Sequence, residues 1–439
     1  MNRNIPKHLS PIETYLFKDN RPSHPLDFFI RLEFEGDIYR DQLQRAISRV
    51  LLFHPMLNAQ VHQHGRRLSW EFNKANAEPI ILHANEESDI SPIDLRTETG
   101  IKCWFSRTES GATVTFQFHH TATDGLGAFG FVSDVIRQYS NGTSETGQPL
   151  RDISRLAERH WFGYERDTLF NMFRRQSRAL MASRGFSGMS FVSVKSHEPI
   201  VNESPPPIKY PHFFSHWFST DETRCLKAQA RSQHVSTNTV IIRDAFVAID
   251  QFRQTQRAYS CDDWIRIAVP GSVRLQRTNQ DLPAANLFSL TFPSFTADQI
   301  SRQERLLQVI HDNIRASRRD YYLPTFLVAL NVIARISGAM EKSVSADKCI
   351  ATLLLTNLGI PLEDITDTPD ALFRSNDLVL TDVELIPPMR PHQTISIAVL
   401  EYAGRQKITM SFDPRIHSNE EADDILNLLI TQLRSTIAP

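Results

Sequence analysis

The chain has 439 residues, 41% hydrophobic and 22% charged, which is typical of a folded globular protein with two or three domains. Its formal net charge of -2 gives no broad attraction to nucleic acid or to an anionic membrane. Its four cysteines lie too far apart for paired zinc motifs. The N-terminus has no apolar stretch of the kind that a signal peptide needs, and no apolar run is long enough for a membrane span. We therefore expect a cytoplasmic protein with free thiols and no membrane contact.

The first half of the chain predicts a mixture of strands and helices. Apolar side chains alternate over residues 28–34, which is typical of a strand with one buried face. Over residues 43–51 they recur at intervals of three and four, which predicts an amphipathic helix. Alternation returns at residues 114–118, and helical spacing at 126–136.

A proline-rich segment, ESPPPIKYP, then interrupts the regular patterns at residues 203–211. We predict an N-terminal domain at residues 1–185, a linker at 186–211 and a C-terminal domain at 212–439. The second half repeats the mixture. It predicts helices near 240–249 and 306–314, strands at 265–269 and 287–292, a hairpin at 395–412, and a last helix that begins with a capping box of Ser418 and Glu421.

The stretch between the strand at 114–118 and the following helix reads HHTATDGLGAFG. Its glycines, Gly125, Gly127 and Gly130, spell GxGxxG. However, six residues separate Phe118 from Gly125, and a polar loop follows the helix, so a dinucleotide site is disfavoured. Close helix packing and room beside a ligand channel explain these glycines better.

The two adjacent histidines, His119 and His120, point to opposite faces of a strand, so they do not converge with Asp124 on one ion, and we expect no metal site. His120 shares the apolar face with Phe118, and His119 shares the polar face with Gln117. Burial keeps an imidazole neutral, which suits a general base near pH 7. A satisfied core histidine is the alternative for His120.

Asp124 stands at the predicted start of the helix. There its carboxylate would cap free N–H groups, pair with a cation, or orient the histidine. The residues leave these three roles open.

HHTATDG matches HHxxxDG, the signature of the superfamily that includes chloramphenicol acetyltransferase, nonribosomal peptide condensation domains, wax ester synthases, alcohol acetyltransferases and polyketide-associated acyltransferases. Other segments resemble this superfamily in the same order along the chain. They are LSPIETYLF (9–17), LLFHPMLNAQV (51–61), VPGSVR (269–274), TNLG (356–359) and FDPRIHSNEEADDIL (412–426). The resemblance covers essentially the whole chain, and HHxxxDG is its specific part.

The resemblance implies an α/β fold with mixed sheets, in which two chloramphenicol-acetyltransferase-like domains form a V around an interdomain tunnel. It implies that His120 is the catalytic base and that His119 is the less critical neighbour. Asp124 then holds the loop through a salt bridge, for which we propose Arg274 as the partner, and Gly125 keeps the channel floor open.

The implied reaction needs a donor for the tetrahedral oxyanion, and Thr356, Asn357 or a backbone N–H would supply it. The alternative role for TNLG is a turn at the end of a strand. The chain has no GxSxG elbow, so we expect no covalent acyl-enzyme.

The predicted function is acyl transfer from a thioester, either acyl-CoA or a phosphopantetheine-linked acyl carrier protein, to an alcohol. LSPIE and TNLG resemble free-standing ester-forming members. The alternatives are a stand-alone condensation enzyme that forms an amide and a non-catalytic relative that docks a carrier protein. The donor is a substrate, so no permanently bound cofactor is expected.

The expected partners are a small-molecule acyl donor, an alcohol or amine acceptor and an acyl carrier protein, with no nucleic acid. The segment at residues 169–185 carries several arginines and no acid. It is either a solvated linker or a contact for the phosphates of coenzyme A, an acidic carrier protein or a membrane surface.

Overall fold

The computed structural model describes residues 7–65, 67–72, 81–83, 90–141, 151–160, 190–197, 211–274, 282–319, 325–344, 349–366 and 371–437. The arginine-rich segment at 169–185 lies outside the described residues, as does most of the predicted linker.

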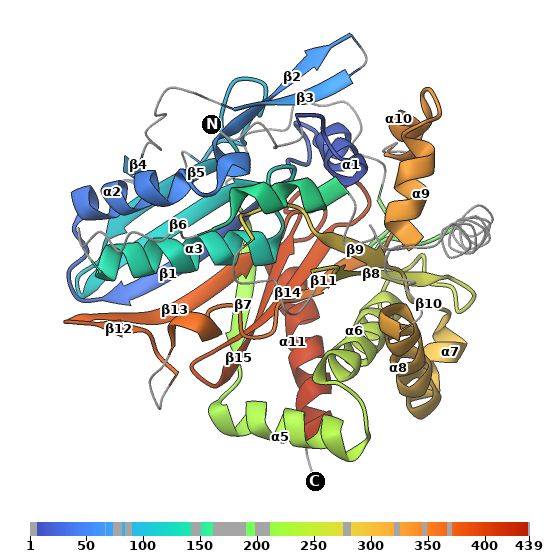
Figure 1. Ribbon diagram of the computed structural model, residues 1–439. Coiled ribbons are helices and arrows are strands. Elements are labelled where there is room, and N and C mark those ends of the chain that lie inside the picture. The colour runs from blue at the N-terminus through green and yellow to red at the C-terminus, as the bar shows by residue number, and fades with distance from the viewer. Residues whose placement is uncertain are drawn as a thin grey trace.

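One six-stranded sheet forms the core of the first half, in the order β12-β13-β1-β6-β5-β4. Its strands are β1 (Asp27–Glu35), β4 (Ile81–His83), β5 (Ile101–Arg107), β6 (Gly111–His119), β12 (Arg374–Ser375) and β13 (Leu378–Ile386). The helices α2 (Arg40–Leu51) and α3 (Gly125–Ser140) cover one face of this sheet (Figure 1). The alternation and the helical spacing in the sequence predicted β1, β6, α2 and α3 correctly, because each buries one apolar face in a common core.

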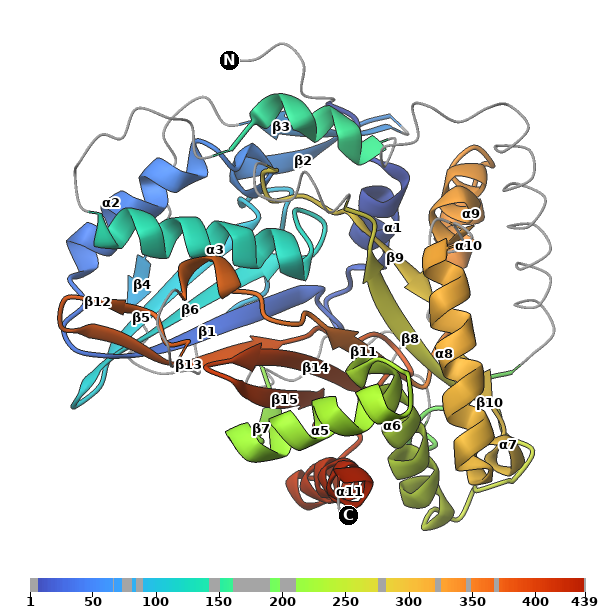
Figure 2. The same cartoon turned by 60° about the horizontal axis from the view of Figure 1, so that its bottom comes forward.

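A second, seven-stranded sheet runs in the order β10-β8-β11-β14-β15-β7, with β9 paired to β8. Its strands are β7 (Phe213–Trp217), β8 (Ile265–Ser272), β9 (Phe288–Thr291), β10 (Ser294–Phe295), β11 (Leu353–Asn357), β14 (Ile395–Tyr402) and β15 (Arg405–Phe412). Its helices are α5 (Thr220–Ser232), α6 (Thr237–Gln254), α7 (Ala297–Ser301), α8 (Gln303–Arg319) and α11 (Asn419–Ile437). Figure 2 shows α5, α6 and α11 gathered beneath β14 and β15.

Local signals at the end of the chain were accurate. The β14–β15 hairpin turns at Ala403 and Gly404, both with positive φ, as a two-residue hairpin turn requires. In the capping box, Glu421 N–H donates to Ser418 Oγ and Ser418 N–H donates to the Glu421 carboxylate, each at 3.2 Å.

The remaining elements surround the two sheets. They are the helices α1 (Pro11–Asp19), α9 (Thr325–Ile333) and α10 (Ala339–Ser343), the hairpin of β2 (Ala59–His64) and β3 (Arg67–Phe72), and 3-10 turns at Pro55–Asn58, Ile153–His160 and Glu363–Ile365. Helix α1 begins with a second capping box, of Ser10 and Glu13. The buried Glu13 carboxylate also accepts hydrogen bonds from Trp70 Nε1 (3.0 Å) and Arg159 Nε (2.9 Å), which gives the LSPIE segment a structural role.

The two halves of the chain do not form two separate sequence blocks. Strand β13, from the second half, pairs antiparallel with β1 from Phe29–Ile386 to Glu35–Val379 and so completes the first sheet. The physical reason is that β1 would otherwise present an apolar strand with one unpaired edge. Lys407 on β15 also reaches β13, with its Nζ 2.8 Å from Asp382 and 3.1 Å from Glu384.

Part of the predicted linker also belongs to the second half. Phe191 forms a β-bridge with Trp264, and Val194 is buried in the core around the second sheet. The predicted linker at residues 186–211 stays a prediction. Residues 374–386 pair with the first sheet.

Candidate active site

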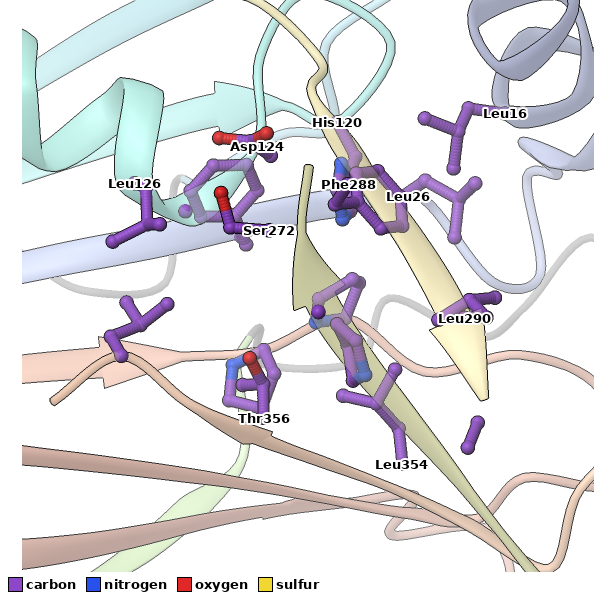
Figure 3. Close-up of a pocket in the computed structure, with 18 of the residues that line it drawn as sticks. Leu16, Leu26, His120, Asp124, Leu126, Ser272, Phe288, Leu290, Leu354 and Thr356 are labelled. Carbon is purple, nitrogen blue, oxygen red and sulfur yellow. The ribbon is translucent and has the colours of Figure 1, made fainter. Parts of the chain in front are cut away.

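A cavity of about 410 Å³ is lined by residues of both sheets. Figure 3 shows His120, Leu16 and Leu26 along one wall, with Leu354 and Thr356 of β11 along the opposite wall. The interdomain tunnel, its two openings and the V shape stay predictions.

His120 is the first residue after β6, and its ring lines the cavity. Its backbone N–H donates to Leu26 O at 2.8 Å, which continues the pairing beyond the strand. The ring lies 5.3 Å, centroid to centroid, from both Phe28 and Phe288. Burial lowers the pKa of His120 below 6.5, and the carbonyl of His120 itself and the Asp124 carboxylate offset only part of this effect. The imidazole is therefore neutral near pH 7.

His119 has a different environment and is not among the lining residues of the cavity. The alternation places it on the face of Gln117 as predicted, but this face is buried because the loop at residues 91–100 covers it. Gln117 Nε2 donates to Ser91 O at 2.9 Å, and His119 N–H donates to Gly100 O at 3.0 Å. His119 Nδ1 accepts the Thr121 N–H at 3.1 Å, and burial lowers its pKa to about 3. His119 therefore stabilises the turn that follows β6.

Asp124 is the N-cap of α3 and the partner of Arg274 at once. Its Oδ1 accepts the Gly127 N–H at 2.8 Å, and Arg274 donates one hydrogen bond of 2.7 Å to each carboxylate oxygen. Leu287 N–H adds a fourth hydrogen bond, to Oδ2, at 2.7 Å. Both side chains are buried, so this network ties the motif loop of the first half to the second half.

A segment of the second half, residues 282–287, lies across the motif loop, and the sequence analysis did not identify it. Asn286 Nδ2 donates to His120 O at 2.9 Å and to Thr121 O at 2.8 Å. Ala284 N–H donates to the buried ring of His54 at 2.9 Å. The only trace in the sequence is an asparagine among small and apolar residues, LPAANLF, where a buried amide needs hydrogen-bond partners.

The glycines of GLGAFG have packing roles. A Cβ on Gly127 would lie 2.4 Å from Thr123 Oγ1 and 3.0 Å from the backbone N of Ala285, so this glycine admits the segment at 282–287. Gly125 lines the cavity, and a Cβ there would lie 3.3 Å from Leu358 Cδ1. Strand β6 runs antiparallel to both of its neighbours, which a Rossmann unit does not allow.

Thr356 and Asn357 end β11, and both line the cavity. Asn357 Oδ1 accepts the Gly359 N–H at 2.9 Å, so this side chain shapes the turn that was the alternative reading of TNLG. Thr356 and His120 come from different sheets and line the same cavity (Figure 3).

In the part of the chain that the structure describes, no helix is long and apolar enough to cross a membrane. Within the same residues, no group of three or more His, Cys, Asp or Glu side chains is arranged to hold a metal ion.

No protein-family model matches the sequence, and no curated protein matches it. Solved structures do match. A trichothecene 15-O-acetyltransferase from Fusarium sporotrichioides superposes with a TM-score of 0.70 at 10% identity, over 98% of this chain and 94% of that chain. Polyketide synthase associated protein 5 from Mycobacterium tuberculosis gives 0.64 at 16% identity, over 100% of both chains.

The first condensation domain of the calcium-dependent antibiotic synthetase gives a TM-score of 0.67 at 12% identity, over 99% of this chain and 96% of that chain. The chain therefore has the mixed α/β fold of these acyltransferase and condensation proteins along its whole length. At these identities the likeness establishes the fold.

Proposed function

We propose that the protein is an acyltransferase that moves an acyl group from a thioester to an alcohol, with His120 as the general base. The observation that carries this proposal is an imidazole, with its pKa lowered by burial, that lines a cavity between two sheets on a loop held by the Asp124–Arg274 pair. The names of the matching structures, an O-acetyltransferase and a condensation domain among them, support acyl transfer as the reaction class.

The two ring nitrogens of His120 have different surroundings. Nδ1 is buried, and the carbonyl oxygens of His120 itself and of Thr123 lie near the ring. We assign the proton to the buried Nδ1, which leaves Nε2 as the basic nitrogen. Nε2 then takes the hydroxyl proton as the alcohol oxygen attacks the thioester carbonyl.

The attack forms a C–O bond and a tetrahedral oxyanion. When this intermediate collapses, the C–S bond breaks and the thiolate takes the proton back from Nε2, so the imidazole is regenerated and no acyl-enzyme forms. We assign the Thr356 hydroxyl as a donor to the oxyanion, because it lines the cavity, whereas Arg274 and Asp124 are engaged with each other.

The apolar part of the lining suits the acyl group. Leu16, Leu26, Leu290 and Leu354 line the cavity (Figure 3). The donor carries its acyl group on coenzyme A or on the phosphopantetheine of a carrier protein, and it is a substrate rather than a resident cofactor. The likeness to a polyketide synthase associated protein and to a synthetase domain supports a carrier protein as a partner.

The test compares wild type, His120→Ala and His62→Ala in a panel of acyl-CoA and carrier-bound donors against alcohols and amines. His62 lies on the exposed hairpin and serves as the matched histidine control. Ester formation should fall by about 10²–10⁴-fold in His120→Ala only. Full activity of that variant rejects the base, and a product formed with amines alone favours the condensation alternative. Carrier binding without any turnover favours a docking protein.

A further inference from the structure

The Asn286 amide lies against the backbone of the catalytic loop in one defined orientation. The side chain is fully buried, and its Nδ2 donates both of its hydrogens, to His120 O and to Thr121 O. A flipped amide would turn its oxygen toward two carbonyl oxygens, which repel it. Oδ1 must therefore point away from these carbonyls, and it can only accept.

Four buried side-chain atoms around this loop lack a hydrogen bond of ordinary geometry, namely Asn286 Oδ1, His120 Nδ1, Thr121 Oγ1 and His119 Nε2. Burying an acceptor without a hydrogen bond is unfavourable, so such a group is retained when it serves another state of the molecule. The Asn286 side chain is close enough to the imidazole to raise the pKa of His120, against the larger effect of burial. The Thr121 hydroxyl competes with His120 for this role, so a test must separate the two.

Asp124 is not free to orient the ring. A carboxylate offers about four lone-pair positions, and those of Asp124 are used by Gly127, Leu287 and the two bonds from Arg274. A third group that orients a catalytic histidine is a common part of base catalysis. The side chain left for this role is that of Asn286.

We propose that Asn286 is a positioning residue for His120, whose Oδ1 accepts the Nδ1–H as the ring takes up the substrate proton. This inference rests on the proposed function and deepens it. The contact holds the tautomer in which Nε2 is the base, and it stabilises the imidazolium that exists while the tetrahedral intermediate is present. Asn286 comes from the second half of the chain and His120 from the first. The base therefore has its positioning contact only when the two halves are packed together.

The experiment reads the imidazole itself and needs no turnover. Two-bond ¹⁵N–¹H spectra of the full chain labelled at histidine report the tautomer and titration of each ring, and the His120 signals are those that vanish in His120→Ala. The variants are Asn286→Ala, Thr121→Val as the control for the neighbouring hydroxyl, and Asn331→Ala. Asn331 also donates to a backbone carbonyl, Leu327 O at 3.0 Å, and lies in α9.

In wild type we expect the Nδ1–H tautomer. In Asn286→Ala alone, the Nε2–H population should rise and the pKa of His120 should fall further. The acid limb of kcat/KM should move to lower pH with it, and kcat should fall about 10–100-fold with KM within about threefold. A variant that is less stable but still folded, with the ring in its native surroundings, would not move these signals.

A wild-type ring in the Nε2–H form overturns the proposal, and this result needs no variant to fold. An unchanged tautomer and titration of His120 in folded Asn286→Ala also overturns the proposal. The carbonyls of His120 and Thr123 would then be sufficient to hold the Nδ1–H tautomer. A larger tautomer change in Thr121→Val assigns the contact to that hydroxyl instead and likewise rejects Asn286. A further outcome is that the tautomer depends on Asn286 while His120→Ala still transfers acyl groups. In that case the proposed function is wrong, but the contact between Asn286 Oδ1 and His120 Nδ1–H is confirmed.

Discussion

Arg274 donates two hydrogen bonds of 2.7 Å to the two carboxylate oxygens of Asp124, and through them the end of β8 is joined to the turn between β6 and α3. Because both side chains are buried and joined by two hydrogen bonds, the pair holds the two segments in one relative orientation and neutralises both charges.

Arg274→Ala should therefore be costly, because it leaves a buried carboxylate without its cation. We expect a loss of about 3–5 kcal/mol in the free energy of unfolding, measured in urea, together with lower kcat. The control is Arg302→Ala, whose pair with Asp298 is largely exposed and should contribute less than about 1 kcal/mol. Equal effects of the two variants would show that the buried pair has no special role. The double variant with Asp124→Ala should lose less than the sum of the two single variants.

The pH dependence of activity should follow the His120 ring. Burial lowers its pKa below 6.5, and only the neutral ring is a base, so activity rises with pH through that low pKa and is constant above it. Measured kcat/KM between pH 5 and 9 should therefore have its acid limb below pH 6.5. An acid limb centred above pH 7 would contradict a desolvated base.

Two glycines of α3 should respond in opposite ways to alanine. In Gly127→Ala the new methyl group meets Thr123 and the backbone of Ala285, so we expect a loss of about 1–3 kcal/mol in the free energy of unfolding and reduced activity. In Gly130→Ala the nearest atom is Arg151 Nη2 at 3.6 Å, an ordinary contact. This helix position should gain about 0.5–1 kcal/mol, which urea unfolding of both variants measures. A Gly127→Ala protein as stable as wild type would place the segment at 282–287 elsewhere.

Asp27 should make stability depend on pH in the direction opposite to most carboxyl groups. Burial raises its pKa from 3.8 to about 7, although its carboxylate accepts hydrogen bonds from Ile93 N–H and Gln117 Nε2, each at 2.8 Å. Between these two values the folded state keeps a proton that the unfolded state has lost, so the contribution of Asp27 to stability falls as pH rises from about 4 to about 7.

Asp27→Asn removes this difference in proton binding between the folded and unfolded states. Relative to wild type, the variant should gain stability steadily between pH 4 and pH 7, and the difference should be constant above pH 7 to 8. Thermal or urea unfolding of both proteins at intervals of one pH unit measures it. Two parallel stability curves would mean that the Asp27 carboxyl group has an ordinary pKa in the folded state.

The sequence predicted what is local. Strand alternation, helical spacing, the capping box at Ser418 and the hairpin turn at Gly404 each depend on residues within one or two turns of each other, and each is present in the structure. HHTATDG likewise identified the loop that lines the cavity.

Other features could not be predicted, because they depend on contacts between distant residues. Nothing in the period of β13 says that it pairs with β1, about 350 residues earlier in the chain, and nothing marks Asn286 as a neighbour of His120. Alternation placed His119 on a polar face, but only the packing of the loop at 91–100 makes that face buried.

The pairing of β1 with β13 also sets the order in which the molecule can be completed. During synthesis, β1 emerges about 350 residues before β13, so its last partner is available only after residue 386 has left the ribosome. Until then one edge of an apolar strand stays open to other chains, a state that favours aggregation and assistance by chaperones. Cutting the gene at the midpoint would thus yield an N-terminal fragment with its sheet unfinished, and a split protein would need its break placed elsewhere.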